Sequence, residues 1–169
     1  SFPTRRSSDL GVFAMLEVYT VSFFGHRHIE TFRTAEEKVD ELIYKLLQQH
    51  EYIEFLVGRD GDFDQIAISA VLKAKHSYAE YRCDITWVMP YPKAEYTKNA
   101  EDFDKYYDYV IVCPDSEKAH PKQAIQVRNK WMVDRSDLAV FWVEHDKGGA
   151  YKTMRYAEKS AINHINLTE

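Results

Sequence analysis

The sequence has few cysteines, few glycines, no long hydrophobic run and no surplus of basic residues. Its 169 residues include only 2 Cys and 6 Gly. Cys83 and Cys113 form no C-x-x-C pair, which argues against a disulfide scaffold or a zinc ribbon and favours two buried small hydrophobic residues. No apolar run approaches the ~18 residues that a membrane-spanning helix needs. We therefore expect no membrane partner and a cytoplasmic location.

The charge balance is acidic. The chain has 22 Lys and Arg against 27 Asp and Glu, which gives a formal net charge of −5. Non-specific binding of nucleic acid depends on cationic side chains that neutralise phosphates. The balance therefore argues against nucleic acid as a partner, although it leaves a local basic site open.

The N-terminal segment 1–14 differs from the rest of the chain. It opens with SFPTRRSSDL, which resembles a translated sequencing adapter and contains no pattern that would bury side chains. We expect residues 1–14 to be adapter-derived or disordered, with Met15 as a candidate start residue. Residues 15–169 contain no internal repeat, low-complexity tract or linker, so we expect them to form a single domain.

From residue 18 onward, short runs rich in β-branched and aromatic residues alternate with amphipathic segments. The runs predict strands over 18–24, 52–57, 85–89 and 138–143, and a final edge strand within 162–167. The amphipathic segments predict helices with starting signals at Thr34, Asp62, Pro121 and Gly148. Residues 109–112 fit either a strand or an apolar anchor under a long loop.

This order of elements predicts the α/β class, with a Rossmann-like, largely parallel sheet and helices on both faces. In such sheets, ligands bind beyond the carboxyl ends of the strands, where loops lead into helix N-termini. The loops at these places are 25–27, 58–61 and 145–149.

The first two loops each have a structural and a functional interpretation. Gly25 lets the backbone turn tightly and approach a ligand, and Arg27 can bind a phosphate or carboxylate. The same two residues fit a turn and a solvated cation equally well. In the second loop, Asp62 and Asp64 follow Gly61 and fit helix caps better than a site.

The third loop, with Gly148 and Gly149, opens the last helix, whose free N–H groups and dipole favour an anion. Glycine loops at three strand ends, two of them with arginine, together predict a phosphorylated ligand. Neither G-x-G-x-x-G nor G-x-x-x-x-G-K-[ST] occurs, which argues against a simple nicotinamide dehydrogenase or a Walker-type ATPase, and we predict no cofactor. His26 and His28 have no accompanying acid or cysteine cluster, so we predict no metal site.

Taken together, several segments resemble a known superfamily. They are FFGHR at 23–27, VGRDGDFD at 57–64, RNKWM at 128–132, SD at 136–137 and GGA at 148–150. In order and spacing, over nearly all of residues 18–167, they are similar to the SLOG superfamily, and most of all to its YpsA-like branch. The resemblance implies a Rossmann-like fold and a pocket for a nucleotide or a nucleotide-derived ligand.

Two relatives in that superfamily bear on the reaction and the partner. LOG-type phosphoribohydrolases, which cleave the base from a cytokinin nucleoside monophosphate, combine a helix arginine with a P-G-G-x-G-T-x-x-E loop. Arg128 is similar to that arginine and Gly148–Gly149 to the glycine pair, but Thr153 or Tyr156 stands where the glutamate would be. The missing carboxylate argues against the LOG reaction. The Smf/DprA branch, which binds single-stranded DNA, is a weaker match because the chain is acidic.

We therefore predict that a nucleotide-like small molecule binds in a Rossmann-like pocket. The glycines would shape a phosphate cradle, Arg27 and Arg128 would supply charge, and Asn129 would bind the ligand or tie the loop. Asp64 would hold a ribose hydroxyl or the neighbouring glycine loop. The predicted ligand-binding residues are Gly25, His26, Arg27, Gly58, Arg59, Gly61, Asp64, Arg128, Asn129, Gly148 and Gly149.

Two other hypotheses stay open. One is a hydrolase of a nucleotide N-glycosidic or phosphoester bond with Asp64 or Asp137 as the acid, although Asp137 fits a cap or turn before Leu138 better. The other is a structural or partner-binding module, since a fold does not fix a function. The sequence assigns no catalytic residue and leaves a homo-oligomer open.

Overall fold

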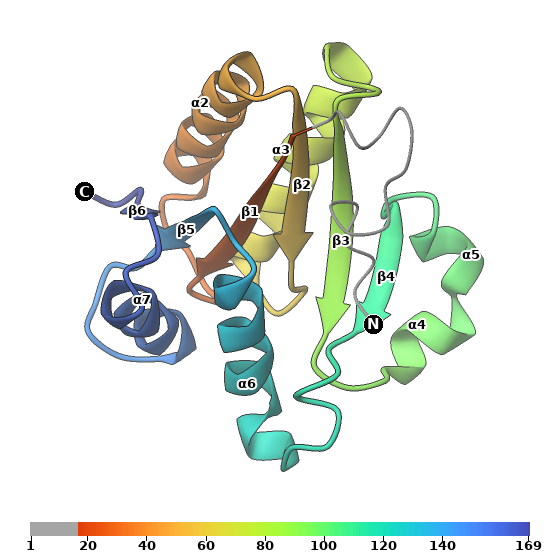
Figure 1. The fold of residues 1–169 in the computed structure, drawn as a ribbon, viewed down its shortest axis with the longest axis vertical. Helices are drawn as coiled ribbons and strands as arrows, with labels where there is room; N and C mark the ends of the chain where they lie inside the picture. The colour runs from red at the N-terminus through yellow and green to blue at the C-terminus, as the bar shows by residue number, and fades with distance from the viewer. Residues whose placement is uncertain (1–16) are drawn as a thin grey trace.

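The computed structural model describes residues 17–169 (Figure 1). The expectations for residues 1–14 and for Met15 as a start lie outside the described residues. Within the described part of the chain, no helix is both long enough and apolar enough to cross a bilayer.

A six-stranded sheet forms the centre of the fold, with the strand order β4-β3-β2-β1-β5-β6. Every neighbouring pair of strands is parallel. This arrangement confirms the predicted α/β, Rossmann-like class. The strands are β1 (Val18–Gly25), β2 (Tyr52–Val57), β3 (Cys83–Met89), β4 (Tyr109–Val112), β5 (Leu138–Trp142) and β6 (His164–Asn166).

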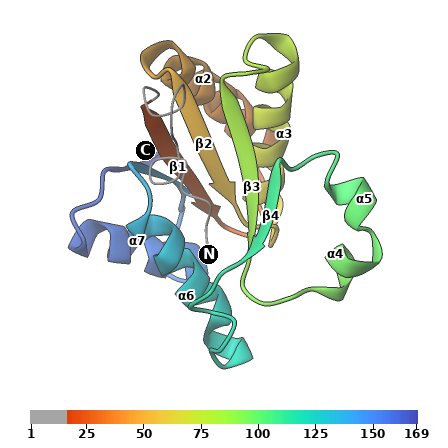
Figure 2. The ribbon, with the colours of Figure 1, turned by 45° about the vertical axis from the view of Figure 1, so that its right-hand side comes forward.

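Helices cover both faces of the sheet, as predicted. On one face lie α2 (Phe32–Gln49) and α3 (Asp62–Ser77), and on the other lie α6 (Pro121–Asp134) and α7 (Gly149–Lys159) (Figures 1 and 2). Two short helices, α4 (Ala94–Lys98) and α5 (Ala100–Phe103), stand beyond the β4 edge (Figure 2).

The period-two alternation of strand side chains divides the core into two clusters. In β1, Phe23 packs with the residues of α2 and α3, whereas its neighbour Phe24 packs with those of α6 and α7. In β2, Phe55 and Leu56 divide in the same way. Strands that are covered on both faces have no polar face, which explains their nearly continuous apolar runs.

The chain changes faces between β1 and β5. These neighbours pair from Val21 with Leu138 to Gly25 with Trp142. The connection that leaves β1 leads to α2 on one face, whereas the connection that leaves β5 leads to α7 on the other. A crevice opens where two such connections part, at the carboxyl ends of the two strands.

The ends of the elements differ in part from the sequence-based expectations. Residues 109–112 form the edge strand β4. Helix α2 begins at Phe32, so Thr34 lies inside the helix and does not cap it. Gly61 precedes α3, and the carboxylate of Asp62 accepts a hydrogen bond from the Ile29 amide instead of capping its own helix. Pro121 does open α6, behind a His120 cap.

Candidate functional site

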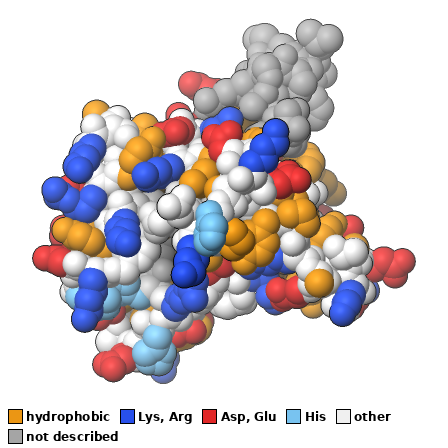
Figure 3. Space-filling model, turned by 90° about the horizontal axis from the view of Figure 1, so that it is seen from below, with side chains coloured by type: hydrophobic (Ala, Val, Ile, Leu, Met, Phe, Trp, Pro, Cys, Tyr) orange, Lys and Arg blue, Asp and Glu red, His pale blue; other side chains and the backbone are white. Residues whose placement is uncertain are grey.

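A pocket of ≈ 460 Å³ lies at the carboxyl ends of β1 and β5. This volume is within the range of small-molecule sites, about 300–1,000 Å³. The pocket is lined by the loop after β1, the loop after β2 with the start of α3, one side of α6, and the loop before α7. Figure 3 views the molecule from this side, where Lys, Arg and His side chains stand close together near the middle of the face.

The structure brings most of the predicted site residues together. Those that line the pocket are Gly25, His26, Arg27, Gly58, Asp64, Arg128, Asn129, Gly148 and Gly149. Arg59 and Gly61 do not line it. The residues come from four separate segments, so only the fold places them side by side.

Arg59 turns away from the pocket. Its Nη1 atom lies 2.5 Å from Glu95 Oε1, and its guanidinium stands 4.9 Å from the centroid of the Phe103 ring. Its neighbour Asp60 points the opposite way and enters the pocket. Arg59 therefore ties α4 and α5 to the loop.

Two glycines of the pocket have backbone reasons to be glycine. A Cβ atom on Gly25 would lie 2.4 Å from the Cβ of Phe63, so the end of β1 packs directly on α3. Gly148 has φ +94°, where L side chains are strained. Gly61 does not line the pocket but lets the loop after β2 pack against the loop after β1, because a Cβ there would lie 2.4 Å from the Cα of Arg27.

Arg128 is a buried anchor, with only 2% of its surface exposed. Its Nε donates to Asn129 Oδ1 at 2.9 Å, its Nη1 donates to the Val88 carbonyl at 2.8 Å, and its Nη2 donates to Asp60 Oδ2 at 2.5 Å. These bonds fix α6 to β3 and to the loop after β2. Much of the positive charge of Arg128 is therefore balanced by Asp60.

The two carboxylates of the pocket differ in their pKa. Burial acts to raise the pKa of Asp60, but the charge and hydrogen bond of Arg128 outweigh it and hold that pKa below its ordinary value. Burial, followed by the negative charge of Asp60, raises the pKa of Asp64 to about 6. Asp64 also accepts a hydrogen bond from the Asp60 amide at 2.8 Å, which ties the start of α3 to the loop after β2.

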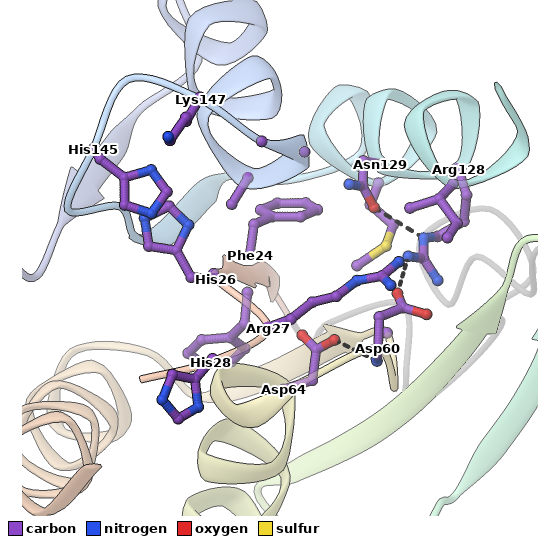
Figure 4. A pocket seen from close by; sticks show the side chains of 18 residues that line it. Phe24, His26, Arg27, His28, Asp60, Asp64, Arg128, Asn129, His145 and Lys147 are labelled. Carbon is purple, nitrogen blue, oxygen red and sulfur yellow. Dashed lines mark hydrogen bonds and ion pairs between the residues drawn. The ribbon is translucent and has the colours of Figure 1, made fainter. Parts of the chain in front are cut away.

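Arg27 is the exposed arginine of the pocket. Figure 4 shows its side chain extending past Asp64 toward Asp60 and Arg128. Within the described residues its guanidinium makes no hydrogen bond and no ion pair. Arg27 is thus available for an anionic ligand.

Histidines and Lys147 line the opposite end of the pocket (Figure 4). The rings of His26 and His145 stack with centroids 4.0 Å apart and planes 7° apart. The Glu144 amide donates to Nε2 of His26 at 2.8 Å, which requires the neutral ring. Burial, and then the charge of His145, lower the pKa of His26, although Glu144 acts to raise it.

The N-terminus of α7 also faces this end. Gly148 precedes the helix, and no side chain among the described residues caps it. The Asn129 amide donates to Thr153 Oγ1 at 3.1 Å, and this hydroxyl donates to the Gly149 carbonyl at 2.9 Å. Asn129 therefore ties the glycine loop. The first N–H groups of a helix lack intrahelical partners and favour an anion.

Sequence reasoning missed several residues that line the pocket. Asp60, His145 and Lys147 are in the loops that the sequence singled out, yet they were not selected. A rule that took whole strand-end loops would have found them. Phe24 and Met132 also line it. They belong to the FFGHR and RNKWM segments of the resemblance, but their apolar side chains did not mark them as ligand-binding residues.

The two candidate acids of the hydrolase hypothesis lie in different places. Asp64 lines the pocket. Asp137 stands just before β5, at the amino end of the strand, where its Oδ2 accepts a hydrogen bond from the Thr20 amide at 2.8 Å. Asp137 is therefore part of the β1–β5 connection and is not a pocket acid.

The fold is shared with solved structures of DNA processing protein A. The protein from Helicobacter pylori, described with a single-stranded DNA binding mode, has a TM-score of 0.61 and 15% identity, covering 86% of this chain and 63% of that chain. The protein from Streptococcus pneumoniae has a TM-score of 0.63 and 12% identity, covering 90% of this chain and 51% of that chain. The present chain thus spans less than two thirds of either. Comparisons with protein-family models and with curated proteins find no match.

These likenesses correct one expectation. The acidic net charge argued against nucleic acid as a partner, and that prediction is wrong, because a protein with this fold binds single-stranded DNA. Net charge averages over the whole surface, whereas binding depends on the local field, and Arg27, Arg128 and Lys147 all line one pocket here.

Proposed function

We propose that this pocket binds a nucleotide or a nucleotide-derived phosphorylated ligand. The observation that supports it most is the convergence of Arg27, Arg128 and Lys147 around one hollow that contains Asp60 and Asp64. The surplus of cations suits an anion, and the volume suits a molecule of nucleotide size. As part of this proposal, the chain belongs to the YpsA-like branch of the SLOG superfamily and acts in the cytoplasm.

The phosphate lies at the α7 end of the pocket in this proposal. Lys147, the uncapped first turn of α7 and the adjacent imidazoles offer donors there. Arg27 reaches the ligand from the middle of the pocket, whereas Arg128 is held by Asp60 and keeps the walls in place. Arg27 and Lys147 are therefore the main anion ligands, and Arg128 is a positioning residue.

Single-stranded DNA is the second candidate ligand. The shared fold with the Helicobacter pylori protein favours it, and a phosphodiester would meet the same cations. This chain spans 63% of that protein, so the likeness concerns only the part that is matched.

A thermal-shift panel tests both candidates. Nucleoside mono- and diphosphates, ADP-ribose, NAD, cyclic nucleotides and a short single-stranded oligonucleotide are added to the wild type and to Arg27→Ala and Lys147→Ala. We expect at least one ligand to raise the melting temperature of the wild type but of neither variant. Arg33→Ala, whose side chain is 91% exposed on α2, is the matched control and should respond like the wild type. No response to any ligand at millimolar concentration would contradict the proposal.

The same incubations test for turnover. Chromatography of the supernatants reveals whether free base or free phosphate accumulates. Product from the wild type that is lost in Asp64→Asn would assign a hydrolase, and its absence in a protein that binds the ligand would retire that alternative.

A further inference from the structure

The carboxylate of Asp64 presents one unused oxygen to the pocket. The residue is 9% exposed and belongs to the first turn of α3. Its Oδ2 accepts the Asp60 amide at 2.8 Å, whereas no described residue donates a hydrogen bond to Oδ1. Figure 4 shows this second oxygen directed into the pocket, beside Arg27. A buried acceptor directed at an open space needs a donor from elsewhere.

The charges around Asp64 decide which kind of donor fits. Asp60 stands next to it, so an anionic group placed here would meet two carboxylates. A second cation is not required either, because Arg128 and Arg27 already face the pair. The remaining chemistry is a neutral donor, and a hydroxyl group donates to a carboxylate with a short, charge-assisted bond.

The two ends of the pocket therefore offer different partners to a ligand. One end offers Lys147, two imidazoles and a helix N-terminus, and the other end offers the acceptor of Asp64 (Figure 4). A ligand that satisfies both ends has an anionic group at one end and a hydroxyl group at the other. Resting on the function proposed above, we propose that Asp64 binds a free ribose hydroxyl, so that the pocket selects ribonucleoside phosphates over their deoxy analogues.

The titration of Asp64 gives this proposal a pH dependence. The groups that face it are Asp60 from the loop before α3, Arg128 from α6 and Arg27 from the loop after β1. The Tyr107 hydroxyl, from the segment between α5 and β4, also interacts with it electrostatically. Burial and Asp60 raise its pKa to about 6. Above that pH the ionised carboxylate accepts the hydroxyl, and below it the charge-assisted bond weakens, so the preference for the ribose form shrinks as the pH falls.

Calorimetric titrations of the wild type with AMP, 2′-deoxy-AMP and 3′-deoxy-AMP test the proposal. We expect at least one deoxy analogue to bind about 10- to 100-fold more weakly than AMP, which is the usual effect of a lost hydrogen bond to a charged group. Equal affinities for all three nucleotides would overturn the proposal and leave the proposed function intact. Binding of none of the three at millimolar concentration would overturn the proposal for Asp64, and the proposed function would also be overturned if the whole thermal-shift panel gave no response.

Asp64→Asn separates a direct contact from a structural effect. The variant keeps an oxygen for the Asp60 amide and replaces the pocket-facing acceptor by a donor. We expect AMP to fall to the affinity of the weaker deoxy analogue, whose own affinity should change little. Asp62→Asn is the matched control, because its carboxylate is in the same turn, accepts the Ile29 amide and does not line the pocket. It should keep the preference, and an Asp64→Asn protein that also keeps it would overturn the proposal.

Discussion

The guanidinium of Arg128 and the carboxylate of Asp60, 68 residues apart in the chain, meet at 2.5 Å and join α6 to the loop after β2. Lys93 approaches the other oxygen of Asp60 at 3.7 Å. The pair holds two walls of the pocket at a fixed separation and leaves Arg27 as the exposed arginine of the site. The structural arginine and the arginine that we propose as an anion ligand are therefore different residues.

Arg128→Ala should destabilise the protein strongly. The change leaves Asp60 without its main partner and removes a donor from the Val88 carbonyl. Breaking one side of a buried ion pair costs about 3–5 kcal/mol of unfolding free energy, which urea denaturation can measure. Arg27→Ala, at an exposed side chain, should change stability by less than about 0.5 kcal/mol. Similar losses in the two variants would contradict the division of roles.

The two neighbouring glycines at the start of α7 should respond differently to alanine. Gly148→Ala forces a side chain into a backbone with φ +94°, where strain costs about 1–3 kcal/mol, although the space around it is open. Gly149 is the first residue of the helix, and a Cβ there meets only the flexible end of Gln126 at 3.0 Å. Gly149→Ala should therefore shift the free energy of unfolding by less than about 0.5 kcal/mol. Equal effects would mean that the loop has another conformation.

Asp64→Asn should change the pH dependence of stability. The pKa of Asp64 is raised from 3.8 to about 6 in the folded chain. Because the folded state then binds the proton more tightly than the unfolded state, ionisation lowers stability as the pH rises through this window and costs a constant amount above it. The free energy of unfolding of the variant, relative to that of the wild type, should therefore rise by up to about 3 kcal/mol between about pH 4 and pH 7. Melting curves that differ by the same amount at both pH values would refute this.

His26 should titrate below its ordinary range, and His145 should be part of the reason. Burial lowers the pKa of His26 first, and the charge of His145 lowers it further. In His145→Asn, NMR titration should place the His26 pKa higher than in the wild type but still below 6.5. The stability that the neutral ring contributes is present above 6.5 and is lost as the pH falls toward the folded pKa. An unchanged His26 pKa in the variant would contradict this effect of His145.

Most strands of the sheet could be predicted from the sequence because their residues are apolar on both faces. A run such as residues 138–142 is apolar on both faces and can only be a covered strand. The sequence left residues 109–112 undecided between a strand and a loop. They form an edge strand that has one neighbour and is only partly buried. There, pairing with β3 decides the structure, and local composition does not.

The site was predictable to the level of loops but not of side-chain directions. Arg59 and Asp60 are adjacent, and only the partners Glu95 and Arg128, distant in sequence, decide that the acid enters the pocket and the arginine leaves it. The predicted helix cap at Asp62 was wrong for the same reason, because the Asp62 carboxylate accepts a hydrogen bond from the Ile29 amide of another segment. Contacts of this kind form across the fold and leave no trace in local spacing.

Amide NMR spectra of the protein titrated with AMP test the central claim most directly, because they report both binding and its place. The account predicts saturable shifts at the amides around Gly25–Arg27, Gly58 and Gly148–Gly149, and their loss in Arg27→Ala. Shifts confined to other parts of the surface, such as the groove beside Lys38 and Leu167, or no shift at millimolar AMP, would contradict it.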